Sequence, residues 1–595
     1  MQRNLIVAIL LVFIFSACKE ENQEKKAKAK LPPIETIFSN YYQTYLKFNP
    51  LEATETGDNR YNDKLPIGIS ETYKTKFWVF NMRYRDTIEM YAEVNLSETD
   101  KMSRAVLEWE IKQSLEGHKF KWELMPLNQM YSLPIYLGQL GSGTSSQPFK
   151  TYKDYNNWLA RLEQFPKWCD VAIENMKKGV SEGYILPRSI IKKVIPQIDD
   201  LAAGKAEENL FFSPVNNLPE LLTEREKKQL TENYTATIEL KVIPALEKLS
   251  SYLKKEYIEA GRTSSGIDMI PAGKEYYNYL IKDYTTTDMT ADEIHNLGLK
   301  EVKRISAEMI KVKEQVGFNG TLKEFFEEVR NNKKLMPFKK PEQVIANFKA
   351  IHETMKPNLN KLFDLKPKTK FEIRRTEAFR EASASAEYNS GSLDGTRPGI
   401  FYVPIPDVKK YNVYSDESLF LHEAIPGHHY QVSLQQENTD LPDFRKTLWY
   451  SAYGEGWALY AESLGKDLGL FTDPYQYFGM LSVEMHRAIR LVVDTGLHAK
   501  GWTREQAIQY SLDNEAESEA SIIAEIERYM AIPGQALSYK IGQLKILELR
   551  ALAQKELGNA FDIKVFHNKM LESGCLPLAL LEEKIKNWIA TVKSK

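Results

Sequence analysis

Hydrophobic residues recur every three to four positions through most of the chain after position 34. Such runs cover 41–48, 72–95, 100–115 and 151–180. Residues three or four apart share one face of an α-helix, so the pattern predicts amphipathic helices packed on a common core. We therefore expect a mainly α-helical fold.

Prolines and capping residues predict where several helices bend or begin. Pro166 is expected to kink or split the run at 151–180, and Pro244 to interrupt a second helical run, because proline cannot donate a main-chain hydrogen bond. Thr290 and Thr321 each stand three residues before a glutamate, which is the capping-box spacing. Helices are accordingly expected near 291–316 and 322–331.

Three short segments between Lys368 and Asp407 have strand composition, and G-S-L-D-G-T-R-P-G among them is turn-rich. The pattern predicts a small β-sheet, and the prolines of I-F-Y-V-P-I-P are typical of an edge strand. An exposed edge can bind an extended peptide through main-chain hydrogen bonds. A sheet that only closes a lobe is an equally good interpretation. Helical patterning then resumes, with breaks near Gly501, Pro533 and Gly574.

The length of 595 residues predicts more than one lobe. We expect a helical lobe at about 31–265 and a second lobe at 266–595, which contains the sheet (368–407) and a histidine-rich segment (422–455). The net charge is −2, from 79 basic and 81 acidic side chains, so no nucleic-acid partner is expected. The oligomeric state stays open.

The first 18 residues resemble an export signal. A positive charge precedes an apolar run at 5–15, which is too short to span a bilayer, and small residues stand just before Cys18. We expect Cys18 to become the lipidated first residue of a bacterial cell-envelope lipoprotein, periplasmic or surface-exposed, followed by a polar tether at 19–30. The lipid would be the only membrane contact. A soluble secreted protein is the alternative, and Cys169 and Cys575 form either one disulfide or two buried thiols.

Five of the nine histidines lie between positions 422 and 498. Two neighbouring segments combine imidazoles and carboxylates, L-H-E-A-I-P-G-H-H-Y-Q at 421–431 and Y-G-E-G-W-A-L-Y-A-E at 453–462. A hydrolytic zinc site needs such donors and one unliganded carboxylate to deprotonate a water molecule. The segments therefore predict one Zn²⁺ per chain.

The histidine spacing differs from H-E-x-x-H, in which residues i and i+4 face the same ion on one helix. Position i+4 from His422 is Pro426, and the next histidines are His428 and His429. On an ideal helix His428 would lie about 120° off the face of His422, and His429 about 10.5 Å further along the axis. Pro426 and Gly427 disfavour a regular helix, so we expect a local bulge that brings His428 round to the metal.

The two segments, with S-G-S-L-D-G-T-R-P-G-I-F-Y, R-L-V-V-D-T-G-L-H and E-R-Y-M-A-I-P-G-Q-A-L-S-Y, resemble a bacterial family described only as domain of unknown function 885. That family is similar to the gluzincin metallopeptidases, which include angiotensin-converting enzyme and carboxypeptidase Taq. The resemblance extends over nearly the whole chain after the export signal. It implies a two-lobed, largely helical metallopeptidase with a small β-sheet next to the metal-binding helix and a deep central cleft.

The resemblance also implies roles for individual residues. His422, His428 and Glu455 would be the metal ligands, and Glu423 the general base that takes a proton from zinc-bound water. His429 is the alternative to His428 as second ligand. Glu462 has two interpretations. It either orients one of the ligand histidines or has a structural or solvated role.

Other candidates come from helices after the metal segments or from the predicted sheet. Donors to the negatively charged oxygen of the transition state would be Tyr529, Tyr539 or His498. Arg397, Arg490 and Arg528 could bind a substrate carboxylate, which would favour exopeptidase action, and Tyr402 is a further substrate-binding candidate. The alternatives are packing for the tyrosines and the histidine, and ion pairs with Asp394, Asp494 and Glu525 for Arg397, Arg490 and Arg528.

The expected function is cleavage of a peptide substrate by a zinc-dependent hydrolase. One alternative keeps the metal but changes the substrate to a non-peptide amide or a cell-wall peptide. Another is a non-catalytic lipoprotein that binds peptides or glycans and uses its metal as a structural staple. Glu423 favours an enzyme, because a structural site needs no unliganded carboxylate beside its metal.

Overall fold

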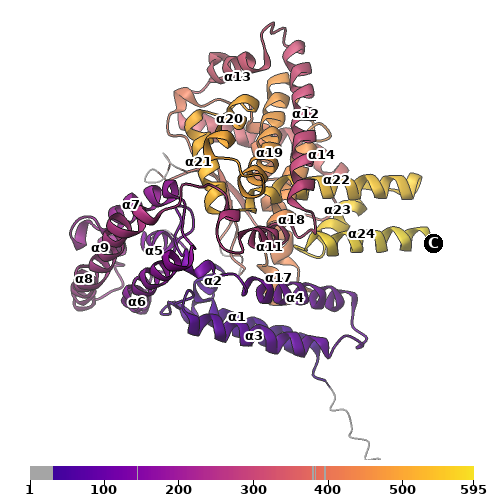
Figure 1. Cartoon of the computed structure of the whole chain (residues 1–595). Coiled ribbons are helices and arrows are strands. Elements are labelled where there is room, and N and C mark those ends of the chain that lie inside the picture. Colours follow the sequence, from indigo (N-terminus) through magenta and orange to yellow (C-terminus); the bar gives the residue numbers. More distant parts are fainter. Residues whose placement is uncertain are drawn as a thin grey trace, which may run out of the picture.

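The computed structural model describes residues 31–143, 145–377, 381, 384–393, 395 and 397–594. Within them the protein is mainly α-helical with one small β-sheet, which confirms the predicted fold class (Figure 1). The predicted export signal, Cys18 and the tether lie outside the described residues. None of the described helices combines the length and the apolar character needed to cross a membrane.

Most of the chain before the sheet is helical. Its helices are α1 (Ile34–Phe48), α2 (Pro50–Glu55), α3 (Glu71–Glu89), α4 (Glu98–Gly117), α5 (Leu133–Gly141), α6 (Tyr152–Glu182), α7 (Arg188–Ala202), α8 (Glu224–Thr237), α9 (Ile243–Tyr252), α10 (Ile258–Ala260), α11 (Gly273–Thr285), α12 (Ala291–Gln315), α13 (Leu322–Asn331) and α14 (Pro341–Leu362). Short 3₁₀ and π-helical turns connect several of them.

The chain after the sheet is helical again. Its helices are α15 (Asp416–Glu423), α16 (His428–Glu437), α17 (Asp443–Lys446), α18 (Ser451–Ser463), α19 (Pro474–Ala499), α20 (Arg504–Asn514), α21 (Glu519–Ala531), α22 (Ser538–Leu557), α23 (Ile563–Leu571) and α24 (Leu578–Lys593). The breaks predicted near Gly501, Pro533 and Gly574 separate α19 from α20, α21 from α22 and α23 from α24.

The predicted capping boxes are present, whereas the proline predictions need correction. Thr290 and Thr321 cap α12 and α13, each exchanging hydrogen bonds with the glutamate three residues later. Helix α6 continues through Pro166 and is not split. The chain also stays helical through Pro244, because the preceding turn Ile238–Val242 widens to π-helical geometry and needs no donor from the proline.

The sheet has three strands in the order β1-β3-β2, formed by β1 (Phe371–Arg375), β2 (Glu387–Asn389) and β3 (Gly399–Val403). Strand β3 pairs in parallel with β1 and antiparallel with β2. The predicted edge strand I-F-Y-V is therefore the central strand, and its prolines follow the last paired residue. The edge beside the histidine-bearing helices is instead β2.

Two hydrophobic cores organise the helices. One combines α1, α3 and α4 with α14, α15, α18 and α22–α24. The other combines α6–α9 with α12, α13, α19 and α21. Both cores contain residues from either side of residue 265, so the domain boundary expected there runs through both cores. Helices α12 and α19 lie side by side near the middle of the molecule (Figure 1). Cys169 and Cys575 are buried free thiols, one in each core.

Candidate metal centre

The histidine segment forms two helices joined by a tight turn, in place of the predicted bulge. Helix α15 ends at Glu423, the next residue leaves helical geometry with φ −107° and ψ −104°, and α16 starts at His428. A Cβ atom on Gly427 would lie 1.9 Å from the carbonyl oxygen of His422, so only glycine fits there. The Trp457 indole donates a 2.8 Å hydrogen bond to the carbonyl of Pro426 and ties the turn to α18.

This turn brings His428 beside His422, and α18 supplies Glu455. One ligand atom from each of the three residues lies within 4.8 Å of the others. The Nε2 atoms of His422 and His428 lie 3.6 and 3.5 Å from Oε2 of Glu455. Donors about 2.1 Å from a tetrahedral zinc ion are roughly 3.4 Å apart. The donor types and their spacing therefore fit a zinc ion.

Glu462 orients the first histidine. Its carboxylate lies 2.8 Å from Nδ1 of His422, and it also accepts a hydrogen bond from the Ser418 hydroxyl. This contact leaves Nε2 of His422 directed at the ligand group. Burial alone would lower the pKa of His422, but its contacts with Glu455 and Glu462 outweigh burial and raise the pKa to about 10. Glu462 and Ser418 therefore hold the His422 ring in place beside the candidate metal position.

The second histidine differs from the first, because its Nδ1 atom is buried and has no hydrogen-bond partner among the described residues. Its ring packs against His422, with centroids 4.8 Å apart, and against Trp449 at 5.7 Å. His428 is thus positioned by ring contacts. The flanking His429 points to the sheet, where its Nδ1 lies 3.1 Å from the Tyr388 hydroxyl, and burial lowers its pKa to about 4.

Glu423 lines the same cavity as the three ligand residues but is not one of them. Its side chain is buried, and burial raises its pKa, while His422 and His428 act in the opposite direction. The cavity has a volume of about 1060 Å³. A carboxylate that is close to the ligands yet outside the ligand group is what a general base requires.

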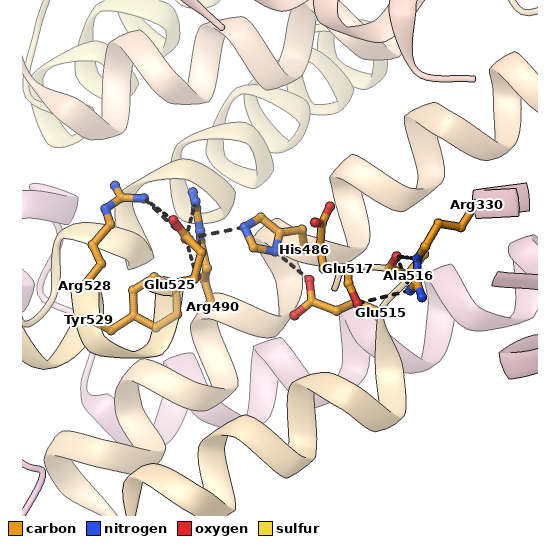
Figure 2. A network of polar contacts seen from close by, with 9 residues as sticks. All are labelled: Arg330, His486, Arg490, Glu515, Ala516, Glu517, Glu525, Arg528 and Tyr529. Atoms are coloured by element: carbon orange, nitrogen blue, oxygen red, sulfur yellow. Dashed lines mark hydrogen bonds and ion pairs between the residues drawn. The ribbon is translucent and has the colours of Figure 1, made fainter. Parts of the chain in front are cut away.

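Helices α19 and α21 form another part of the cavity lining, called the arginine wall below, with Arg487, Arg490 and Arg528. Arg490 donates a 2.8 Å hydrogen bond to Glu525 and a 3.1 Å hydrogen bond to the Tyr529 hydroxyl, as Figure 2 shows. His486 in turn contacts Glu515 at 2.5 Å and Glu525 at 3.5 Å. Glu525 thus joins Arg490, His486 and Tyr529, and the expected pair of Arg490 with Asp494 does not form.

Arg487 is the residue of this wall that the sequence reasoning missed. Its guanidinium lies 5.1 Å from the centre of the Tyr539 ring, and Arg490 lies 4.5 Å from the same ring. The buried Nε of Arg487 and Nη1 of Arg490 have no hydrogen-bond partner among the described residues. Since Arg487, Arg490 and Tyr539 all line the metal cavity, they present donors to whatever it binds. The spacing of the two arginines on one face of α19 was visible in the sequence, but the direction of that face was not.

The remaining predicted residues divide by location. Tyr539 and Arg397 line the cavity, Arg397 at an exposed position, whereas its suggested partner Asp394 lies outside the described residues. Arg528 forms an ion pair with Glu525, as the alternative interpretation predicted, and donates a hydrogen bond to Gln535. Three predicted residues are not part of the cavity lining. They are Tyr402, His498 and Tyr529.

His498 and Tyr529 are removed from the cavity by their hydrogen bonds. His498 is buried, its Nδ1 accepts from the amide of Ile267, and its Nε2 lies 3.0 Å from the carbonyl of Tyr529. Burial lowers the pKa of His498 to about 3. The Tyr529 hydroxyl donates to Glu525 at 2.7 Å. The Tyr529 hydroxyl thus contacts Arg490 and Glu525 of the arginine wall, and His498 contacts the main chain of Tyr529.

Comparison with known proteins gives the same overall architecture. The crystal structure described as "the putative lipoprotein from Colwellia psychrerythraea" matches with a TM-score of 0.87 and 28% identity, covering 94% of this chain and 99% of that chain. A "putative lipoprotein of unknown function from Shewanella oneidensis" matches with a TM-score of 0.67 and 19% identity, covering 93% and 99%. A search of curated proteins found no match.

A family model also matches most of the chain. It is described as "Bacterial protein of unknown function (DUF885)" and covers residues 50–585. The match includes the metal segments, the sheet and the arginine wall. The chain therefore belongs to the DUF885 family of bacterial proteins.

Proposed function

We propose that this protein is a zinc-dependent hydrolase that cleaves peptide bonds. The observation that carries the proposal is the convergence of His422, His428 and Glu455 within 4.8 Å, beside the unliganded carboxylate of Glu423 in one cavity. Two imidazoles and one carboxylate leave a fourth position open in a tetrahedral site, as catalytic zinc sites do. The resemblance to gluzincins supports the same assignment.

Each residue would then have a separate task. His422, His428 and Glu455 would hold the ion, which when bound polarises the scissile carbonyl and acidifies the attacking water. Glu423 would accept the proton of that water and return it to the leaving amine. Arg487 of α19 and Tyr539 of α22, which line the same cavity, would donate hydrogen bonds to substrate oxygens.

The position of the sheet supports an extended peptide as substrate. Residues 385–390, which include β2, line the metal cavity. Strand β2 pairs with β3 on one side only, and no strand pairs with its other edge among the described residues. A peptide could add to that edge by main-chain hydrogen bonds.

We also propose that Cys18 carries the lipid that anchors the protein in the bacterial cell envelope. The export-signal pattern and the two solved relatives described as lipoproteins support this location. Metabolic labelling with a clickable fatty acid would test it. Cys18→Ser should abolish the label, and a label that persists in this variant would refute the assignment.

The decisive experiment incubates the zinc-loaded protein with a mixed peptide library and identifies products by mass. The wild type should produce new peptide termini. Glu423→Gln should retain one zinc per chain and lose cleavage, by about 10²- to 10⁴-fold, because it cannot accept the proton. Full activity in Glu423→Gln would disprove the assigned base, and absence of cleavage in the zinc-loaded wild type would disprove peptide hydrolysis.

A further inference from the structure

A second cavity shares the side chain of Trp449 with the metal cavity. Its volume is about 350 Å³, within the range of small-ligand sites. Helices α1, α3, α4 and α11 form its walls together with residues 449–451 at the start of α18. Trp449 lines both cavities. Nothing in the proposed hydrolysis uses this second cavity.

Two carboxylates line the second cavity without a cationic partner. Glu110 comes from α4 and Asp283 from α11, and neither forms an ion pair with a lysine, arginine or histidine among the described residues. Burial raises the pKa of Glu110 to about 7 and that of Asp283 to about 6. Buried carboxylates normally have a paired cation, since an isolated charge is costly to bury. Arg445 lowers the pKa of Glu110 from a distance but forms no ion pair with it, so neither carboxylate has a cation in contact among the described residues.

Two buried polar groups in the same cavity are also unpartnered. Oε1 of Gln113 and the hydroxyl of Tyr450 make no hydrogen bond of standard geometry, and their residues are only 7% and 6% exposed. The Tyr450 hydroxyl is nevertheless near enough to Glu110 to lower the pKa of that carboxyl. Native proteins rarely leave such groups unsatisfied. Since the Tyr450 hydroxyl acts on Glu110 as a donor, the acceptors around this space are the two carboxylates and Oε1 of Gln113.

Aromatic rings make up much of the remaining lining. These residues are Tyr41, Tyr45, Phe77, Trp109, Tyr279, Tyr284 and Trp449. The faces of aromatic rings attract organic cations, and the attraction strengthens where water is excluded. A hard metal ion would instead need six or more oxygen ligands. The lining therefore favours an organic cation over a metal.

We propose that the cavity bounded by Glu110, Asp283, Gln113 and Tyr450 binds a primary ammonium group. The N–H donors of an ammonium ion match the acceptor oxygens of Glu110, Asp283 and Gln113, and its single positive charge offsets one of the two carboxylate charges. The ammonium group has two possible sources. It belongs either to a peptide that occupies the metal cavity and passes Trp449, or to a separate small amine.

Isothermal titration of the full-length protein with benzylammonium tests the site, and benzyl alcohol is the neutral probe of similar shape. Benzylammonium should bind, and the alcohol should bind at least about 10-fold more weakly, because it lacks the charge. The double substitution Glu110→Gln and Asp283→Asn should weaken benzylammonium binding by about 10-fold or more. Glu108→Gln, an exposed neighbour on α4, is the matched control and should leave it unchanged.

Equal affinity for both probes, unchanged affinity in the double variant, or no saturable binding would each overturn the proposal. Gln113→Met removes an acceptor without changing charge and should weaken binding if the double variant does not fold. Competition with a peptide, free or acetylated at its amino terminus, distinguishes the two sources. Displacement by the free peptide alone assigns the site to the substrate, and no displacement assigns it to a separate amine. These titrations require no hydrolysis, so they can fail while the proposed function stands.

Discussion

The two walls of the metal cavity carry opposite charge and obtain their chemistry in different ways. On the wall of α15, α16 and α18, donors from three helices converge within 4.8 Å of one another. On the wall of α19 and α21, Arg487 and Arg490 both lie near the ring of Tyr539, and Arg490 also donates to Glu525. The first wall gathers electron-pair donors around one point, whereas the second spreads N–H donors along a surface.

Each wall lacks a binding partner: the ligand wall lacks a cation, and the arginine wall lacks a hydrogen-bond acceptor. The ligand wall has an excess of donors for a cation, and the arginine wall leaves two buried N–H-bearing atoms without an acceptor, Nε of Arg487 and Nη1 of Arg490. A substrate carbonyl or carboxylate between the walls would supply the missing acceptor. The following substitutions test the two walls separately, starting with the largest expected effect.

The adjacent histidines of α16 give the strongest test of the ligand wall. His428→Ala should lose bound zinc and all hydrolysis, because Nε2 of this residue is 3.5 Å from the Glu455 carboxylate. His429→Ala is the matched variant and should keep zinc, since its ring contacts Tyr388. Metal analysis of the purified variants, together with peptide cleavage, measures both. The reverse pattern would move the ligand to His429.

The arginine wall should matter for turnover but not for metal binding. Arg487→Gln is expected to lower kcat/KM by about 10²-fold, the usual cost of removing one donor to a transition-state oxygen, with zinc content unchanged. Arg528→Gln should have a smaller effect, because Arg528 is already paired with Glu525 and Gln535. Equal losses in the two variants would mean that the arginines act only through packing.

Glu462 tests the support behind the ligand wall. Glu462→Gln should weaken zinc affinity by about 10- to 100-fold, because it removes the charge 2.8 Å from Nδ1 of His422. Ser418→Ala, which removes only a hydrogen bond to Glu462, should have a smaller effect. Competition with a fluorescent zinc chelator measures both affinities. An unchanged affinity in Glu462→Gln would make Glu462 a packing residue.

His498 tests the support behind the arginine wall through pH. Its pKa in the folded protein is about 3, below the usual 6.5, so the unfolded chain takes up the proton first as the pH falls. The resulting stability is complete above about pH 6.5 and decreases below it, by about 2 kcal/mol at pH 5. Urea unfolding measures this as the difference in the free energy of unfolding between pH 7 and pH 5. That difference should be about 2 kcal/mol smaller in His498→Gln than in the wild type. An equal pH dependence would refute the neutral buried state.

The sequence was sufficient to predict the helical class, the small sheet, the starts of α12 and α13, and the residue types that gather at the candidate metal centre. These features depend on local spacing, since helix faces and capping boxes are set within a few residues. The concentration of imidazoles and carboxylates in two short segments indicated a metal site, and the family resemblance implied His422, His428 and Glu455 as its ligands.

Only the tertiary structure decided how those residues meet. The turn at Gly427 forms two helices because Trp457 of α18 binds the carbonyl of Pro426, a contact 31 residues away in the chain. Likewise the directions of Arg487 and His498 on α19 depend on which helices pack against each face. Local pattern sets a residue's helix and face, but long-range packing sets what that face contacts, so the arginine wall and the second cavity could not be read from spacing alone.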